Sequence, residues 1–179
     1  MATALKIAVV IPAHKRHELL RNAVRSILDQ DLDKSEYELV VVDSSPDDSV
    51  QKVVEELAPQ TPCLFHFRQK EAEGPGPSRN LGIATTTAPI IAFMDSDCIA
   101  TPGWLRAGLA AFSDQTGIVQ GPVIPDPTKA PDRFLAHSAG RPGDLLLPDG
   151  QRLLQARMLR GLRRFHQELD ASRASECRR

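Results

Sequence analysis

Short apolar runs alternate with amphipathic stretches along roughly the first two thirds of the chain. The runs are rich in β-branched residues and end at polar or turn-forming residues, which is typical of strands buried on both faces of a parallel sheet. The stretches between them carry apolar residues three and four positions apart, which predicts helices. The predicted strands cover 7–11, 38–42, 63–67, 89–94 and 117–123, and the predicted helices cover 17–30, 47–57, 78–85 and 102–112.

This alternation predicts an α/β fold: a Rossmann-like, doubly wound, mostly parallel sheet with flanking helices. Ligands of such sheets bind beyond the carboxyl ends of the strands. Three polar clusters directly follow predicted strands, at 12–16, 43–45 and 95–97. Because the predicted topology brings these ends to one edge of the sheet, we expect a binding site there.

The pattern changes after residue 125. Residues 125–148 are rich in proline and glycine, which indicates loop. Residues 151–169 then carry an apolar stripe surrounded by arginines, which predicts a basic amphipathic helix. The expected organisation is a binding core at 1–125, a loop-rich connection at 126–150, and a C-terminal helix and tail at 151–179. We expect that helix to pack on the sheet or to join a homodimer or partner subunit, with an anionic membrane surface as the alternative.

Composition narrows the classes of partner and compartment. The net charge is -1, so the whole molecule offers no electrostatic reason to bind nucleic acid. Cys63, Cys98 and Cys177 lack the spacing of a zinc site, and we interpret them as reduced thiols. The apolar runs are shorter than a membrane-spanning helix requires. We therefore expect a cytoplasmic protein, or one peripheral to the membrane.

Asp95 and Asp97 are the candidate metal ligands. Two carboxylates two residues apart at a strand end can face one hard cation, and Mg²⁺ or Mn²⁺ takes its other ligands from water and phosphate. Such a cation neutralises a diphosphate leaving group as its bond breaks. The alternative is that both residues cap the next turn. The strand before them and the two other clusters favour the metal site.

The remaining candidates each have a functional and a structural interpretation. Asp43 can accept a hydrogen bond from a nucleobase such as uracil, or it can be a turn residue. Arg79, at the start of a predicted helix, can reach phosphate oxygens or form a solvated ion pair with Glu71 or Glu73. His14 and Arg16 can approach a nucleotide or lie in a solvated loop.

Several segments, in their order, resemble the family 2 glycosyltransferases of the GT-A fold. They are VVIPAHKR (9–16), SILDQ (26–30), ELVVVDSSPDDS (38–49), GPSRNLGIATTTAPIIAFMDSDC (76–98) and TPGWL (101–105). The resemblance covers about the first 125 residues. It implies a UDP- or GDP-linked sugar donor, a divalent metal (Mg²⁺ or Mn²⁺), and inversion at the anomeric carbon by direct displacement. The acceptor, whether glycan, lipid or small molecule, is not implied.

The resemblance also implies roles for individual residues. The pocket for the nucleotide is formed at the end of the first strand, Asp43 faces the base, and Asp95 contacts ribose or sugar. Asp97 ligates the metal, with Asp95 beside it. The full set of residues expected to bind the nucleotide sugar is Pro12, Ala13, His14, Arg16, Asp43, Arg79, Asn80 and Asp95.

The chain departs from the family pattern in two places. The family often has two acidic residues where this chain has Asp43 followed by Ser44. No segment after Val123 matches the second acidic motif that supplies the general base, so we assign no catalytic base. Family catalytic domains are commonly longer, so the chain is expected to be shortened, diverged or completed by a partner.

The leading hypothesis is an inverting, metal-assisted glycosyltransferase. The alternative is a nucleotide-sugar-binding or regulatory module without a general base. A nucleotidyltransferase is disfavoured, because no glycine-rich loop containing arginine follows the first strand.

Overall fold

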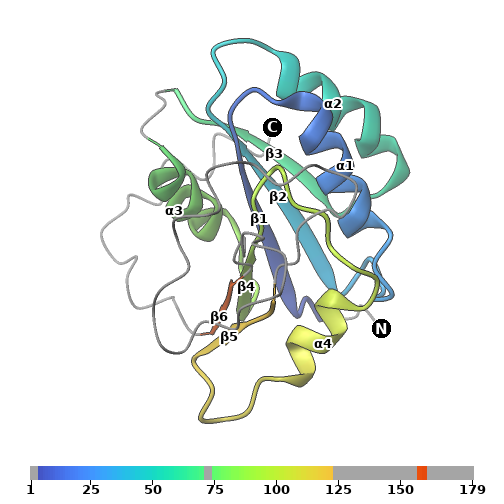
Figure 1. Cartoon of the computed structure of the whole chain (residues 1–179), viewed down its shortest axis with the longest axis vertical. Coiled ribbons are helices and arrows are strands. Elements are labelled where there is room, and N and C mark those ends of the chain that lie inside the picture. The colour runs from blue at the N-terminus through green and yellow to red at the C-terminus, as the bar shows by residue number, and fades with distance from the viewer. Residues whose placement is uncertain (1–3, 71–73, 123–156, 161–179) are drawn as a thin grey trace, which may run out of the picture.

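The computed structural model describes residues 4–70, 74–122 and 157–160. Within these residues the strands form one six-stranded sheet, in the order β3-β2-β1-β4-β6-β5 (Figure 1). Strands β1 to β4 are mutually parallel, whereas β6 pairs antiparallel with both β4 and β5. The strands are β1 (Ile7–Ala13), β2 (Tyr37–Asp43), β3 (Leu64–Arg68), β4 (Ile90–Phe93), β5 (Ile118–Gln120) and β6 (Arg157–Arg160).

Helices cover both faces of the sheet, as the alternation of strands and helices predicted. Helices α1 and α2 lie on one face and α3 lies on the other (Figure 1). The helices are α1 (His17–Leu28), α2 (Ser49–Leu57), α3 (Pro75–Thr85) and α4 (Trp104–Ala110), with a short 3-10 turn at Ala58–Gln60. Among the described residues, no helix combines the length and apolar character needed to cross a membrane.

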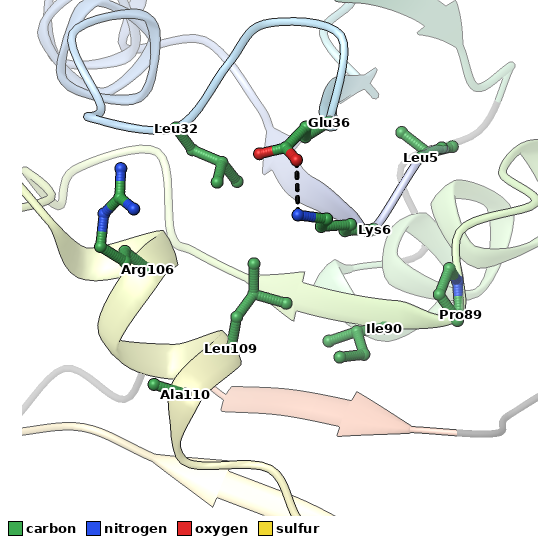
Figure 2. A pocket seen from close by; sticks show the side chains of 9 residues that line it. All are labelled: Leu5, Lys6, Leu32, Glu36, Pro89, Ile90, Arg106, Leu109 and Ala110. Carbon is green, nitrogen blue, oxygen red and sulfur yellow. Dashed lines mark ion pairs between the residues drawn. The ribbon is translucent and has the colours of Figure 1, made fainter. Parts of the chain in front are cut away.

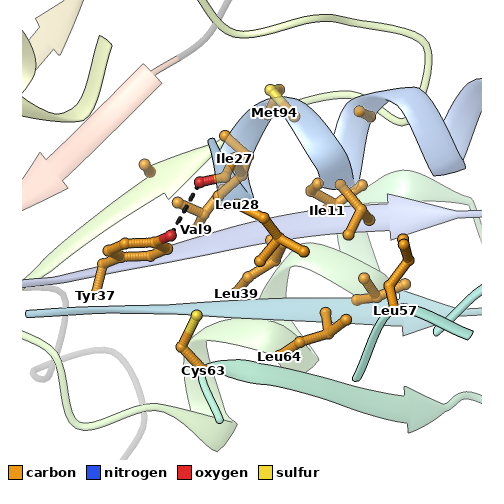
Figure 3. Packing of buried hydrophobic residues seen from close by; sticks show 14 of the residues in the cluster. Val9, Ile11, Ile27, Leu28, Tyr37, Leu39, Leu57, Cys63, Leu64 and Met94 are labelled. Atoms are coloured by element: carbon orange, nitrogen blue, oxygen red, sulfur yellow. Dashed lines mark hydrogen bonds between the residues drawn. The ribbon is translucent and has the colours of Figure 1, made fainter. Parts of the chain in front are cut away.

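Strand β1 is a central strand of the sheet, and its sequence is apolar without alternation because both of its faces are buried. Val9 and Ile11 pack toward α1 and α2, while Ala8 and Val10 pack in the second core layer beneath α3. All four are fully buried, since each face of a doubly wound sheet needs its own apolar layer. In the first layer, shown in Figure 3, the Tyr37 hydroxyl donates a hydrogen bond of 3.0 Å to the carbonyl of Ile27.

Helix α3 starts earlier than predicted. The sequence 74–77 indicated a turn-rich loop, but α3 begins at Pro75. Proline is favoured in the first helical turn, because a backbone N–H at that position has no acceptor within the helix and its absence costs nothing. Gly74 precedes the helix at φ 93°, a conformation that favours glycine. The other strands and helices predicted before residue 125 are present, with shifted ends.

The predicted C-terminal helix is wrong at residues 157–160, which form β6. In β6, Met158 pairs with Ala92 of β4 on one side and with Val119 of β5 on the other. Backbone pairing to two neighbours overrides the local helical pattern, since propensity is only a weak preference. The rest of 151–169 lies outside the described residues, as do 126–150 and Cys177, so the proposed domain division stays a prediction. Cys63 and Cys98 are free thiols.

Candidate functional site

The polar clusters that follow β1 and β2 form one connected turn region. Ala13 and Asp43 are paired at the ends of these strands. The ring Nδ1 of His14 lies 2.9 Å from the carbonyl oxygen of Ser44, and the backbone N–H of Lys15 donates to Ser45 Oγ at 2.7 Å. The two segments, about 30 residues apart in sequence, therefore meet at the carboxyl edge of the sheet, as expected for parallel strands.

The third cluster, after β4, joins this edge through two ion pairs. Arg16 Nη1 lies 3.2 Å from Asp97 Oδ2, which ties the loop after β1 to the loop after β4. Arg79 Nη2, from α3, lies 2.7 Å from Asp95 Oδ1. Arg79 is thus paired with a site carboxylate. Asn80, the next residue on α3, is exposed.

Asp95, Asp97 and Cys98 present ligand atoms that all lie within 4.8 Å of one another. Burial, together with the negative charge of Asp97 and Asp95, raises the pKa of the Cys98 thiol to about 11. The thiol therefore stays protonated at neutral pH, which makes it a weak ligand and a weak nucleophile. The two carboxylates are hard oxygen donors, so the residues present fit Mg²⁺ or Mn²⁺ better than a metal that prefers sulfur.

The backbone between β1 and α1 is strained. Lys15 and Arg16 have φ of 57° and 51°, in the left-handed region that non-glycine residues rarely enter. The Lys15–Ser45 hydrogen bond and the Arg16–Asp97 ion pair hold this turn. Strain of this kind concentrates at functional sites. Here it aims the Arg16 side chain at the cluster after β4.

Asp43 is fully buried, and both of its carboxylate oxygens have protein partners. Oδ1 accepts the backbone N–H of Ser45 at 2.8 Å, and Oδ2 lies 3.3 Å from Nε2 of His66. Asp43 therefore does act as a turn residue, the structural role that the sequence left open, because it accepts the backbone N–H of Ser45. His66 is a residue that sequence reasoning missed, because its place beside Asp43 depends on the pairing register of β2 with β3.

The loop after β2 is fastened by Arg68 at the end of β3. Its guanidinium donates to Asp48 Oδ1 at 2.8 Å and to the carbonyl oxygens of Ser45 and Asp47 at 3.1 and 2.9 Å. Arg68 Nε also lies 3.9 Å from Asp43 Oδ2. The buried carboxylate therefore has a cationic neighbour, Arg68, in addition to its contact with the His66 ring.

The ionisation of Asp43 predicts acid sensitivity. Burial opposes ionisation, but hydrogen bonds from His66 and Ser45 outweigh it and hold the pKa of the Asp43 carboxyl below its ordinary value of 3.8. A depressed folded-state pKa contributes stability at pH above 3.8, and that stability is lost as pH falls toward the folded-state pKa. We expect the free energy of unfolding to fall on acidification below about pH 4, and to fall less steeply in Asp43→Asn.

Urea unfolding from neutral pH to about pH 3 measures this difference. Asp29→Asn, at the exposed C-cap of α1, is the matched control and should follow the wild-type profile. Parallel acid profiles for the wild type and Asp43→Asn would contradict the assigned ionisation of Asp43.

A pocket of about 630 Å³ lies at the opposite, amino-terminal end of β1 and β4 (Figure 2). The Lys6–Glu36 ion pair lies in it, and Leu109 of α4 forms part of its wall. This pocket is separated from the three polar clusters by the length of the strands. It is not part of the candidate site.

Comparison with known proteins gives a family match. The sequence model of Glycosyl transferase family 2 matches residues 8–170. Among individual proteins, the chain is 29% identical over 112 residues to glycosyltransferase AglE of Haloferax volcanii. The aligned residues make up 63% of this chain and 36% of AglE. The chain is 27% identical over 111 residues to the poly(ribitol-phosphate) beta-N-acetylglucosaminyltransferase TarS of Staphylococcus aureus, covering 62% of this chain. The chain spans only 19% of that TarS sequence.

Solved structures give a matching result. The crystal structure of S. aureus TarS 1-349 in complex with UDP-GlcNAc aligns with a TM-score of 0.55 and 28% identity, covering 59% of this chain and 30% of that one. The mannosyltransferase PcManGT from Pyrobaculum calidifontis, solved with GDP-Man and Mn²⁺, aligns with a TM-score of 0.60. At 24% identity, over 65% of this chain and 35% of that one, PcManGT supports the fold alone.

Proposed function

Because the chain belongs to the family 2 glycosyltransferases, we propose that it binds a nucleotide-linked sugar at the carboxyl edge of its sheet and transfers the sugar to an acceptor. The observation that carries the proposal is the joining of two carboxylates and two arginines at that edge, through the pairs Arg16–Asp97 and Arg79–Asp95. Support also comes from TarS, a relative solved with UDP-GlcNAc.

The site has charges of the kind that a sugar diphosphate requires. Arg16 and Arg79 can bind phosphate oxygens, since guanidinium groups pair well with such anions. Asp97, with Asp95 beside it, would hold Mg²⁺ or Mn²⁺, which supplies neutralisation of the charge that develops on the leaving diphosphate. Each arginine then exchanges its carboxylate partner for a phosphate group of the donor.

The proposed reaction is a single displacement with inversion. The acceptor hydroxyl oxygen forms a bond to the anomeric carbon while the bond from that carbon to the diphosphate oxygen breaks. The nucleoside diphosphate leaves with the bonding electron pair, and the hydroxyl proton goes to a general base. Asp95 and Asp97 are the proposed metal ligands, and Asp43 is fully buried and bound to His66 and Ser45. We therefore assign the general base to none of them.

A second candidate function is a module that binds the nucleotide sugar without transferring it. It is favoured by one observation, namely that no segment of the sequence after Val123 matches the family's second acidic motif. A partner chain or a further segment would then supply the base. The two functions share the same donor site and differ only in turnover.

Calorimetric titration of the chain with UDP and GDP, each with and without Mn²⁺, tests the donor site. We expect one of the two nucleotides to bind and Mn²⁺ to strengthen its binding. Failure of both nucleotides to bind would contradict the proposed function. Release of nucleoside diphosphate from the matching nucleotide sugar then separates the two candidates, since the binding module should show tight binding and no release.

A further inference from the structure

The corner formed by the ends of β2 and β3 exposes a histidine where the sequence predicted a carboxylate. Asp43 is fully buried, whereas the side chain of His66 is 18% exposed. Strand β3 is at the edge of the sheet next to β2, so this corner lies at one end of the row of strand ends (Figure 1). Of the two residues in this contact, only His66 is accessible to a ligand, and the 35% exposed side chain of Arg68 lies beside them.

The contact with Asp43 fixes the hydrogen-bonding character of that ring. An ionised carboxylate can only accept hydrogen bonds, so the 3.3 Å contact requires His66 Nε2 to carry the proton. In the neutral ring the other nitrogen, Nδ1, is then an acceptor. Asp43 Oδ1 is already engaged by the backbone N–H of Ser45. The corner therefore offers a ligand one ring acceptor rather than a free carboxylate with two oxygens.

The spacing of the strands places this corner at the base end of a nucleotide. Given the proposed function, the diphosphate lies at Asp95 and Asp97, after β4. Two strand spacings separate β4 from β2, and three separate it from β3. At about 4.8 Å per spacing, the corner lies roughly 10–14 Å away, comparable to the reach of a nucleoside diphosphate from its phosphates to its base.

Resting on the proposed function, we propose that His66 is a specificity-determining residue that makes the donor site select uracil over guanine. The pairing edge of uracil has one N–H donor, N3–H, which matches the single acceptor Nδ1. The pairing edge of guanine has two adjacent donors, N1–H and the amino group, and a free carboxylate would match both. Asp43 acts as the positioning residue that holds the ring and its tautomer.

The experiment measures dissociation constants of the chain for UDP, GDP and inorganic pyrophosphate, all in the presence of Mn²⁺. His66→Gln keeps an N–H donor for Asp43 and adds a carbonyl acceptor, whereas His66→Leu removes both. His17→Leu, at the exposed start of α1, is the control. Arg68, 3.9 Å from Asp43, still compensates the buried charge in His66→Leu, and thermal unfolding checks that each variant is folded.

We expect the wild type to prefer UDP over GDP and His66→Leu to lose about tenfold in UDP affinity, the usual scale of one hydrogen bond. Pyrophosphate affinity should not change in any variant, and His66→Gln should retain most of the preference for UDP. If folded His66→Leu keeps the wild-type ratio of UDP affinity to GDP affinity, the specificity role of His66 is wrong, while the proposed donor site is not contradicted. If the wild type binds none of the three probes, the donor site itself is wrong.

Discussion

Replacing Asp97 with alanine is expected to abolish the Mn²⁺-dependent part of nucleotide binding while leaving the chain folded. Asp97 is partly exposed, and its ion pair with Arg16 is of the surface kind that contributes only about 0–1 kcal/mol to stability. A divalent cation held by two carboxylates, in contrast, loses one of its protein ligands. We expect metal affinity to fall at least about a hundredfold, because removing a direct ligand costs more affinity than removing a group that only orients a ligand.

The Arg16–Asp97 pair provides an internal check on that result. In Asp97→Ala the Arg16 guanidinium loses its partner and becomes available to phosphate oxygens. Binding of UDP without metal should therefore stay equal or become slightly tighter, whereas a misfolded variant would lose it. Titration with UDP, with and without Mn²⁺, measures both effects, and Asp29→Ala at the exposed C-cap of α1 is the matched control. Metal dependence that survives in Asp97→Ala would rule out Asp97 as a ligand.

The sequence was sufficient for the parts of the fold that local patterns determine. The predicted family resemblance and GT-A fold are confirmed by the family match and by the structural neighbours. The clusters at 12–16, 43–45 and 95–97 could be placed at one edge because parallel strands of a doubly wound sheet end together. Each cluster follows a run so apolar that only a buried strand accommodates it, as Val9 and Val10 illustrate.

Contacts that depend on register or on side-chain direction were not predictable. His66 meets Asp43 only because β3 pairs with β2 so that His66 lies opposite Val41. The choice of Asp95 as the partner of Arg79 likewise depends on how α3 crosses the sheet. Strand β6 was missed for a related reason, since its pairing with β4 and β5 joins segments far apart in sequence. A helical spacing of apolar residues contains no information about such neighbours.

Replacing Gly82 with alanine is expected to destabilise the chain, although alanine is normally favoured over glycine inside a helix. A Cβ at Gly82 would lie 2.3 Å from Val10 Cγ1 and 3.1 Å from Val10 Cγ2. Val10 is fully buried in the central strand, and its branched side chain is stiff, so it cannot move aside easily. Overpacking of this kind costs about 1–3 kcal/mol, which outweighs the gain of up to about 1 kcal/mol from replacing a helical glycine.

Gly76→Ala in the same helix is the matched control. A Cβ there meets nothing within 4 Å, so Gly76→Ala should leave the free energy of unfolding unchanged or raise it. Denaturant unfolding measures both variants, and equal stability of the two would contradict the contact. Adding Val10→Ala to Gly82→Ala should recover part of the loss, because the two side chains then fit together.

The same contact sets the position of a donor-site residue. Arg79 lies three residues before Gly82 on α3 and pairs with Asp95 at 2.7 Å. A helix pushed away from β1 by the added methyl group takes Arg79 with it, while Asp95 stays at the end of β4. Folded Gly82→Ala should therefore also bind UDP more weakly, and Val10→Ala should restore that binding in parallel with stability. Recovery of stability without recovery of binding would show that Arg79 reaches the donor independently of how α3 packs on the sheet.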